Sequence, residues 1–332
     1  MGVLRLARRV PKAWVAAGLF LAWRLLRRDR RQRVPFTGRK HVVLVPEAVE
    51  RALGETTFAR LLASKRRVPE SDPRARRVAA LGAAIVRAAA AGDGAGGYVD
   101  HLRDAAWRFV VLDDPAVNAC ALPGGKVCVN AGLIDRFAGD DAALAFVVAH
   151  EVGHVVARHS AEQLTMQAAT QLVATVAQGV ALAAGGPAPT KQGAQGVETL
   201  LEMGLFRPRS REQEYEADAI GVELVRAAGL GDGSASIAVF QCFDALADAA
   251  GAAGAMTKQL SFLSTHPSPA ERAHAVRERL SMGGGRAVAA AAGALRGGRG
   301  GAHAPQRAPA AAPPPQARSK AEQMKVEAMG AY

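Results

Sequence analysis

Two histidines and one glutamate stand at a spacing that suits metal chemistry. In the run "AHEVGHVV", His150 and His154 are four residues apart, and Glu151 follows the first of them. Residues four apart on an α-helix share a face, so both imidazoles can hold one metal ion, and neutral imidazole is a good zinc ligand. Glu151 is rotated by about 100° from His150, where it can take a proton from a water that the metal activates. With only 8 histidines in 332 residues, a chance occurrence of this pattern is rare.

A catalytic zinc needs a third protein ligand and an open position for water. His159 stands nine residues after His150 and would lie on the opposite side of a continuous helix, so we expect a structural or supporting role for it. The sequence also lacks the glycine turn of the HExxHxxGxxH zinc proteases, which brings a third histidine back to the metal. The third ligand is therefore expected elsewhere in the chain.

The segment "SREQEYEADAIG", residues 210–221, offers a better third ligand. Ser210 followed by Gln213 forms a capping box, which predicts that a helix starts here. Glu214 and Asp218 then share one face of that helix. Glu214 can ligate zinc, and Asp218 can accept the free N–H of a ligating histidine and fix the orientation of its ring. The alternative is that these acids form a solvated face of the helix.

Two other acids of the same segment, Glu212 and Glu216, are expected on the solvated face of this helix. The helix that carries the two histidines is expected to begin near Asp140 or Asp141, because either residue is a good N-cap. Two helices of this kind would bury polar groups that a metal ion holds together.

Three short strands are expected before the histidine helix. "RFVVL" reads as one strand, and "AVNACAL" and "KVCVN" read as two more, joined at Pro123-Gly124-Gly125, which is a hairpin turn signal. Nearer the N-terminus, residues 41–45 ("HVVLV") could form a strand, and Pro46 suits the first turn of a helix. A further helix is expected over residues 74–90.

The composition, 49% hydrophobic and 22% charged, allows a core in one or two domains. The net charge of +12 is concentrated in residues 1–40, which hold twelve Lys or Arg and one acid, Asp29. The rest of the chain is nearly neutral, which argues against a nucleic-acid-binding body. The three cysteines, Cys120, Cys128 and Cys242, form no CxxC pair and are expected to be small buried apolar residues.

The basic leader contains an apolar run of 11 residues, 13–23, which is short of the ~20 needed to span a bilayer. It suits an organellar presequence or a short anchor, and a plain surface helix is the alternative. Residues 163–190 carry no charge, but five polar residues fall on one helical stripe, namely Gln163, Gln167, Gln171, Thr175 and Gln178. This helix could pack on the core or lie on a membrane. After residue 281 the Gly-, Ala- and Pro-rich tail is expected to be disordered.

Three motifs, "HEVGH" with "RHSAEQ", then "SREQEYEAD", then "THPSPAER", resemble those of the gluzincin metallopeptidases, the family of the CAAX prenyl protease and HtpX. The resemblance covers about residues 34–280. With "VPFTGRKHVVLVPE" and "VNACALPGGKVCVNAGLI", the order is most similar to a mitochondrial inner-membrane branch that responds to stress. It implies a zincin fold, mainly α with a small β-sheet (α+β), built on an HExxH helix and an ExxxD helix.

The resemblance implies one Zn²⁺ per chain and assigns it three ligands, His150, His154 and Glu214. It makes Glu151 the general base and gives Asp218 and Arg272 supporting roles. His266 matches a family histidine that can contact the metal or the oxyanion of the reaction. Its alternative role is only to cap a helix that begins after Pro267.

The resemblance also implies a substrate-binding edge strand at Asn118, Pro123, Gly124 and Gly125, where an extended peptide could add as a further strand. Two features depart from the family pattern. Cys120 stands where an aromatic residue is usual, and Arg207 and Arg209 precede the ligand helix, where a neutral approach is usual.

By resemblance, the chain is expected to be a metalloendopeptidase of the mitochondrial inner membrane, with a plastid or bacterial envelope membrane as the alternative. Its partners would be membrane-associated or misfolded protein substrates and a lipid surface, with room for a homo-oligomer and without nucleic acid.

We expect four parts along the chain: a leader (1–40), a helical N-terminal part (41–100), a metallopeptidase domain (101–280) and the tail (281–332). A membrane-tethered zinc-fold binding protein without turnover is the second hypothesis. A nucleic-acid binder driven by the leader is the third.

Overall fold

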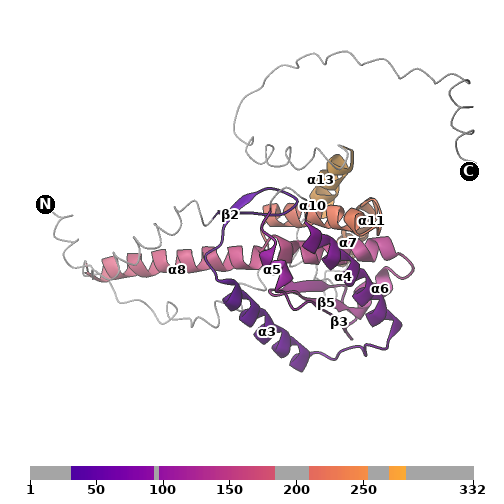
Figure 1. Ribbon diagram of the computed structural model, residues 1–332, viewed down its shortest axis with the longest axis horizontal. Coiled ribbons are helices and arrows are strands. Elements are labelled where there is room, and N and C mark those ends of the chain that lie inside the picture. Colours follow the sequence, from indigo (N-terminus) through magenta and orange to yellow (C-terminus); the bar gives the residue numbers. More distant parts are fainter. Residues whose placement is uncertain (1–30, 93–96, 184–208, 253–268, 282–332) are drawn as a thin grey trace, which may run out of the picture. The chain divides into compact units, whose positions relative to one another are not determined.

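Helix α7 (Asp141–Val156) is the central element, and other helices and the main sheet pack around it (Figure 1). The structure, a computed structural model, describes residues 31–92, 97–183, 209–252 and 269–281. Asp140 caps α7, and its side chain accepts a hydrogen bond from the backbone N–H of Ala143, which confirms the predicted helix start. Residues 143–156 are all buried, so the two histidines and the glutamate of this run lie inside the protein.

A three-stranded sheet lies beside α7. Its strands are β3 (Arg108–Leu112), β4 (Ala119–Leu122) and β5 (Lys126–Asn130). The order is β3-β5-β4, with β4 antiparallel and β3 parallel to the middle strand. The predicted hairpin is confirmed, although β4 begins at Ala119 rather than at residue 116. Within the described residues no strand pairs with the other edge of β4.

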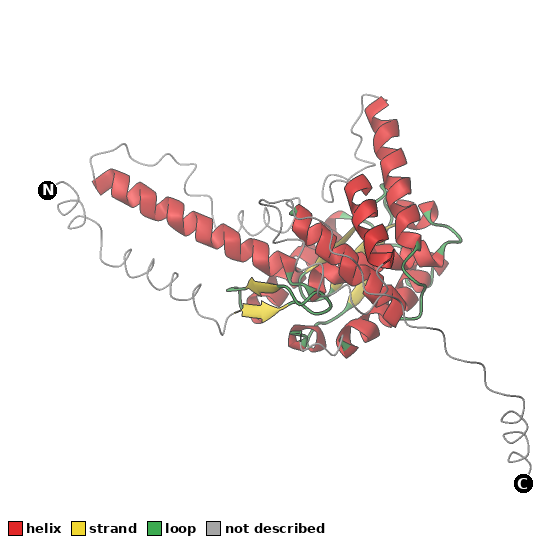
Figure 2. Ribbon diagram, turned by 90° about the horizontal axis from the view of Figure 1, so that it is seen from above, coloured by secondary structure: helices red, strands yellow, loops and turns green. Residues whose placement is uncertain are grey.

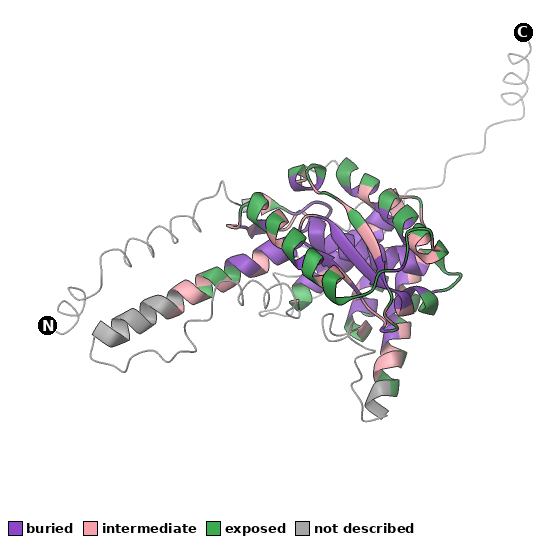
Figure 3. Ribbon diagram, turned by 90° about the horizontal axis from the view of Figure 1, so that it is seen from below, coloured by how far each residue is buried: buried purple, intermediate pink, exposed green. Residues whose placement is uncertain are grey.

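The two faces of this sheet contribute to different parts of the core. Val111, Val127 and Val129 pack in the main core with α7, whereas Leu112 and Cys128 pack in a small cluster with Phe58 of α3. This alternation is the period of two expected for strands that are covered on both faces. The sheet is therefore covered on both faces next to the histidine helix, and Figure 3 shows the buried ribbon gathered in this central region.

In the described residues before α7, a small hairpin and four helices accompany the main sheet. They are β1 (Arg31–Arg33), β2 (Lys40–Val42), α3 (Glu47–Ser64), α4 (Pro73–Ala91), α5 (Asp100–Arg103) and α6 (Ala131–Arg136). The predicted helix starts at Pro46 and near residue 74 are confirmed. The predicted strand over 41–45 is shorter, because β2 ends at Val42 after pairing with β1.

After α7 the structure describes four more helices, α8 (His159–Ala183), α10 (Arg211–Ala227), α11 (Ala235–Ala252) and α13 (Pro269–Ser281). With two small sheets among them, the predicted α+β class is confirmed (Figure 2). The expectation of one continuous helix through His159 is wrong. Arg158 has a positive φ of 54°, and this left-handed residue ends α7 and sends the chain into the separate helix α8.

Several sequence predictions fall outside the described residues. They concern the apolar run of the leader, the Gly-, Ala- and Pro-rich tail, Arg207 and His266. In the part of the chain that the structure describes, no helix is long and apolar enough to cross a bilayer. Cys128 is buried, Cys120 and Cys242 are half-buried, and all three are free thiols.

Candidate metal centre

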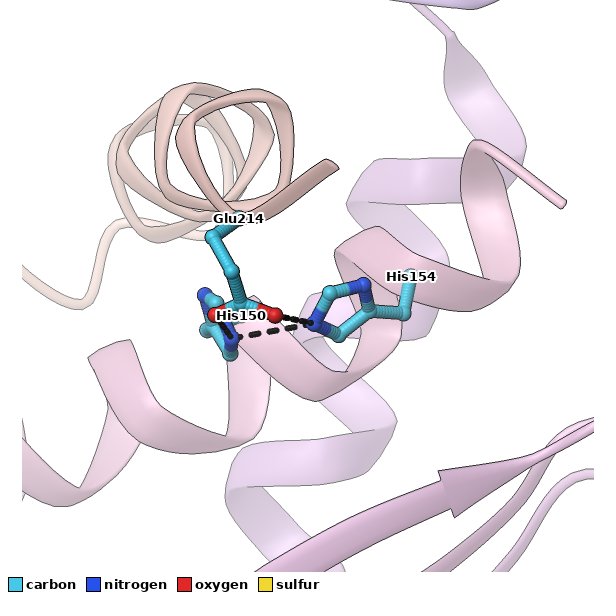
Figure 4. A group of neighbouring side chains, drawn as sticks. All are labelled: His150, His154 and Glu214. Carbon is cyan, nitrogen blue, oxygen red and sulfur yellow. Dashed lines mark hydrogen bonds and ion pairs between the residues drawn. The ribbon is translucent and has the colours of Figure 1, made fainter. Parts of the chain in front are cut away.

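Three side chains from two helices converge in the core (Figure 4). His150 and His154 come from α7, and Glu214 comes from the first turn of α10. Each residue is at most 2% exposed, and their potential ligand atoms all lie within 4.8 Å of one another. The structure therefore brings together the three residues that the sequence predicts as ligands.

The distances suit one small cation. The Nε2 atoms of His150 and His154 are 3.1 Å apart, and each lies 3.5 Å from an oxygen of Glu214. Ligands bound at ~2.0–2.1 Å to a tetrahedral zinc lie about 3.3 Å from one another, so this triangle has the right size. Two imidazoles and one carboxylate also form the protein ligand set of a catalytic zinc, with a fourth position left open. The residues fit the metal.

The charge balance also favours a cation. Burial lowers the pKa of His150, but its hydrogen bonds to Asp218 and Glu214 raise it, and the net pKa is about 9. Without a metal the site therefore draws a proton to this ring. A divalent ion would supply the same positive charge to the surrounding carboxylates.

Close contact between α7 and α10 places Glu214 beside the histidines. A Cβ on Gly153 would lie 3.0 Å from the carbonyl oxygen of Ala217, and a Cβ on Gly221 would lie 3.2 Å from the backbone nitrogen of His150. Glycine at both positions lets the two backbones approach each other. The predicted capping box is confirmed, because Ser210 accepts from Gln213 N–H and the Gln213 side chain accepts from Ser210 N–H.

Asp218 supports His150 from the opposite side of its ring. The Nδ1 atom of His150 lies 2.8 Å from Asp218 Oδ1, so an Nδ1–H donates there and Nε2 faces the ligand triangle, where its lone pair can bind a metal ion in place of the extra proton. Arg272 of α13 donates to both oxygens of Asp218 and lies 3.1 Å from Glu214. Burial would raise the pKa of Asp218, but the charge of Arg272 lowers it below its usual range.

His154 has a different neighbour, His159 at the start of α8. Their Nδ1 atoms are 2.7 Å apart, and His159 Nε2 lies 3.0 Å from Glu216. The expectation that Glu216 is solvated is wrong: it is buried because α10 turns this carboxylate toward α8 and the N-terminal hairpin. Glu212, by contrast, is exposed.

Neither His159 nor Glu216 could be assigned to this cluster from the sequence. The chain turns after α7 at Arg158, and neither a glycine nor a proline marks this position. A continuous helix was therefore the expectation from the sequence. Arg39 completes the cluster by donating to Glu216 across 177 positions of the chain. No local pattern signals a contact of that range.

The predicted general base, Glu151, is 1% exposed and adjoins the first histidine on α7. Arg209 is half-buried, and the charges of Glu151 and Glu214 are among those that favour its charged form. Burial lowers the pKa of Arg209 in spite of these charges. The departure from the family pattern at this position therefore brings a positive charge close enough to the site to interact with its carboxylates.

The predicted edge strand is only partly accessible. Asn118 and Cys120 are half-buried, whereas Pro123 and Gly125 are buried. The turn packs on α3, since a Cβ on Gly54 would lie 1.9 Å from the carbonyl oxygen of Pro123. The part of this edge that could meet a ligand is therefore the beginning of β4.

A buried HExxH helix, joined to a glutamate of a second helix, defines a centre of the zincin type. The sequence profile of peptidase family M48 matches residues 86–280, more than half of the chain, and the chain belongs to this family. The resemblance carried by the three motifs is confirmed.

Among its relatives, the chain is 40% identical over 182 residues to "Mitochondrial metalloendopeptidase OMA1" of Schizosaccharomyces pombe, covering 55% of this chain and 49% of that protein. It is 28% identical over 251 residues to the protein of the same name in Saccharomyces cerevisiae, covering 72% and 66%. It shares 32% over 178 residues with "Putative beta-barrel assembly-enhancing protease" of Vibrio cholerae, covering 52% and 34%. The chain thus spans about half the length of the first relative and about a third of the last.

Proposed function

We propose that this chain is a zinc-dependent metalloendopeptidase. The observation that carries the proposal is the buried triangle of His150, His154 and Glu214, with Glu151 beside it on the same helix. The relatives named as metalloendopeptidases and proteases support the same activity. Zinc is favoured because two imidazoles and one carboxylate suit it better than they suit Mg²⁺ or Ca²⁺, which prefer oxygen ligands.

In this proposal His150, His154 and Glu214 hold the ion. When bound, zinc would polarise the scissile carbonyl and lower the pKa of the attacking water. Asp218 keeps the proton of His150 on Nδ1, which leaves the Nε2 lone pair for the ion. Arg272 keeps Asp218 ionised and in place.

The carboxylate of Glu151 moves the proton. It takes a proton from the attacking water and passes it to the nitrogen of the leaving amine, so that the peptide bond is hydrolysed without a net change at the enzyme. Burial of the site limits the access of bulk water to this carboxylate. By family resemblance we assign His266, outside the described residues, as a donor to the oxyanion.

An extended substrate segment would bind along the edge of β4 that pairs with no strand of the described residues, near Asn118 and Cys120. For the substrates we propose membrane-associated or misfolded proteins, and for the site of action the mitochondrial inner membrane. The names of the fungal relatives and the concentration of basic residues in the leader support a mitochondrial location. The lipid surface would be met by the leader.

A binding protein that keeps the metal but does not turn over remains the competing function. It would have no use for Glu151, whose burial next to the ligands is costly unless the carboxylate has a role. No other feature of the described residues favours this function.

The test compares the purified wild type with Glu151→Gln on an unfolded protein substrate. We expect the wild type to cleave it and the variant to lose at least ~100-fold of the rate, while both bind one zinc ion per chain by elemental analysis. Equal cleavage by both proteins would end the proposal. A zinc-loaded wild type without activity on any unfolded substrate would favour the binding protein instead.

A further inference from the structure

A line of hydrogen bonds runs away from the metal site on the side of His154. The Nδ1 atoms of His154 and His159 are 2.7 Å apart, and the Nε2 atom of His159 lies 3.0 Å from Glu216 Oε2. All three side chains are buried. The proposed function makes no use of His159 or Glu216. The hydrogen bonds that these two residues form nevertheless lead to the imidazole of His154, which would hold the ion.

The position of each proton along this line follows from the ligand role of His154. A neutral imidazole carries one N–H and one lone pair. If Nε2 of His154 offers its lone pair to the ion, Nδ1 carries the hydrogen and donates it to Nδ1 of His159. That nitrogen must then accept, so the hydrogen of His159 sits on Nε2 and is donated to Glu216. Every atom along the line has one defined role.

Glu216 is held as an acceptor at the far end. Arg39 Nε donates to its Oε2 at 2.7 Å, and the Thr37 hydroxyl donates to its Oε1 at 2.6 Å. Both oxygens of Glu216 therefore accept hydrogen bonds from Thr37 and Arg39. An acceptor at this end sets the direction of the hydrogen bond from His159 and, through it, of the one from His154.

The far end of the line is tied to the N-terminal hairpin. Arg39 also forms a two-pronged ion pair with Glu162 of α8, at 2.8 and 2.9 Å. Glu162 in turn accepts from Gln213 of α10. The loop between β1 and β2 therefore fixes the position of Glu216 relative to both helices.

We propose that His159 and Glu216 are positioning residues for His154, and that their hydrogen bonds fix its tautomer and ring orientation for metal binding. The inference rests on the proposed metal site. It assigns to His154 the same kind of outer support that Asp218 gives His150, delivered through one additional imidazole. Arg39 anchors this support from the N-terminal part of the chain.

A purely structural role for His159 makes a different prediction. In that case its loss would lower the free energy of unfolding of the metal-free protein and leave the metal affinity of the folded fraction unchanged. The positioning role that we propose predicts a loss of zinc affinity in a protein that is still folded. Zinc affinity and folding must therefore be measured separately.

The first test is competition with a zinc chelator on the full-length protein, with circular dichroism to verify folding. We expect His159→Phe to bind zinc about 10- to 100-fold more weakly than the wild type. His101→Phe is the matched control, because His101 is also buried, but it stacks on Tyr98 and its Nε2 lies 3.1 Å from the Val155 carbonyl near the end of α7. Its zinc affinity should equal that of the wild type. A folded His159→Phe protein with wild-type affinity would overturn the inference.

The second test uses Glu216→Gln, which removes the charge and keeps the shape. The amide can also donate, so it no longer imposes the tautomer of His159, and zinc affinity should fall in this variant too. Because Glu216 acts through His159, the double variant should bind zinc no more weakly than His159→Phe alone. If the fold-losses of zinc affinity of the two single variants simply multiply in the double variant, the proposed positioning role is refuted. If His159→Phe does not fold, unchanged affinity in Glu216→Gln is the refuting result.

A spectroscopic measurement separates this inference from the proposed function. Cobalt replaces zinc at such sites, and its visible absorption reports the coordination geometry. We expect a changed spectrum for His159→Phe and an unchanged one for His101→Phe. If the wild type binds neither metal, the proposed function fails. If the wild type binds zinc and cleaves protein while the spectra of wild type and His159→Phe coincide, only the positioning role fails.

Discussion

The two histidines of the metal site are supported in different ways. The support of His150 consists of one hydrogen-bonded residue, Asp218, which contacts its ring. Arg272, which is 2% exposed, holds the Asp218 carboxylate in place in the core. The support of His154 consists of two residues in series, because His159 contacts its ring and Glu216 contacts His159. Glu216 is in turn held by Arg39, whose side chain is 28% exposed. One support is a short buried charge pair and the other is a longer chain that ends near solvent. Breaking them should therefore have unequal consequences.

The largest difference is expected between the two arginines. Arg272→Leu would leave the buried carboxylates of Asp218 and Glu214 without their counter-charge, which costs about 3–5 kcal/mol. Arg39→Leu should cost only about 1–2 kcal/mol, because water can reach part of its surroundings. Urea unfolding of both variants in the metal-free state measures the two losses. Equal losses would contradict the distinction between a buried support and a partly exposed one.

A second prediction contrasts His159 with His101, a buried histidine that lacks a carboxylate partner. Its Nε2 lies 3.1 Å from the Val155 carbonyl, and its Nδ1 has no hydrogen-bond partner within the described residues. Burial and the charge of Arg158 lower its pKa to about 4. Between pH 6.5 and 4 the imidazole of His101 is therefore protonated in the unfolded chain and neutral in the folded chain.

Stability should consequently fall as the pH falls through that window, by up to about 3 kcal/mol from this group. The full contribution is present above pH 6.5 and is lost as the pH approaches 4. Urea unfolding of wild type and His101→Phe at a series of pH values isolates the effect, since other titrating groups cancel in the difference. A difference that does not change with pH would show that the pKa of His101 is the same in the folded and unfolded chains.

How much of this site the sequence revealed depends on the range of each contact. The support of His150 has a local signal, because Glu214 and Asp218 stand four apart on one helix and a capping box marks its start. The hairpin of β4 and β5 was predictable for the same reason: its turn residues adjoin its strands.

The support of His154 had no such signal. It depends on a left-handed residue, Arg158, at a position where neither glycine nor asparagine marks it, and on Arg39 from the far N-terminal side. Burial of Glu216 follows from tertiary contacts that periodicity on α10 does not contain. Local rules predicted the ligands and one of their supports, and packing between distant segments decided the other.

A third prediction sharpens the comparison at the level of metal binding. Asp218→Asn should weaken zinc binding by about 10- to 100-fold, because a neutral amide holds the proton of His150 less firmly and no longer balances Arg272. Glu216→Gln should lose less, since an intact His159 still separates it from the ligand. Chelator competition on both variants gives the ratio of the two losses. A larger loss for Glu216→Gln would reverse the order of the two supports.

The smallest effect is expected where both supports share one foundation. Helix α10 carries Glu214, Glu216 and Asp218, and its capping box depends on Ser210, which accepts from the N–H of Gln213 at 3.2 Å. Ser210→Ala should cost about 1 kcal/mol in urea unfolding. Because the whole first turn loosens, both supports should weaken alike, and the ratio of the zinc affinities of Asp218→Asn and Glu216→Gln should be the same with or without the cap. A ratio that shifts in the Ser210→Ala background would mean that the two supports do not share α10 as a common rigid base, and that one of them depends mainly on the other helix it contacts.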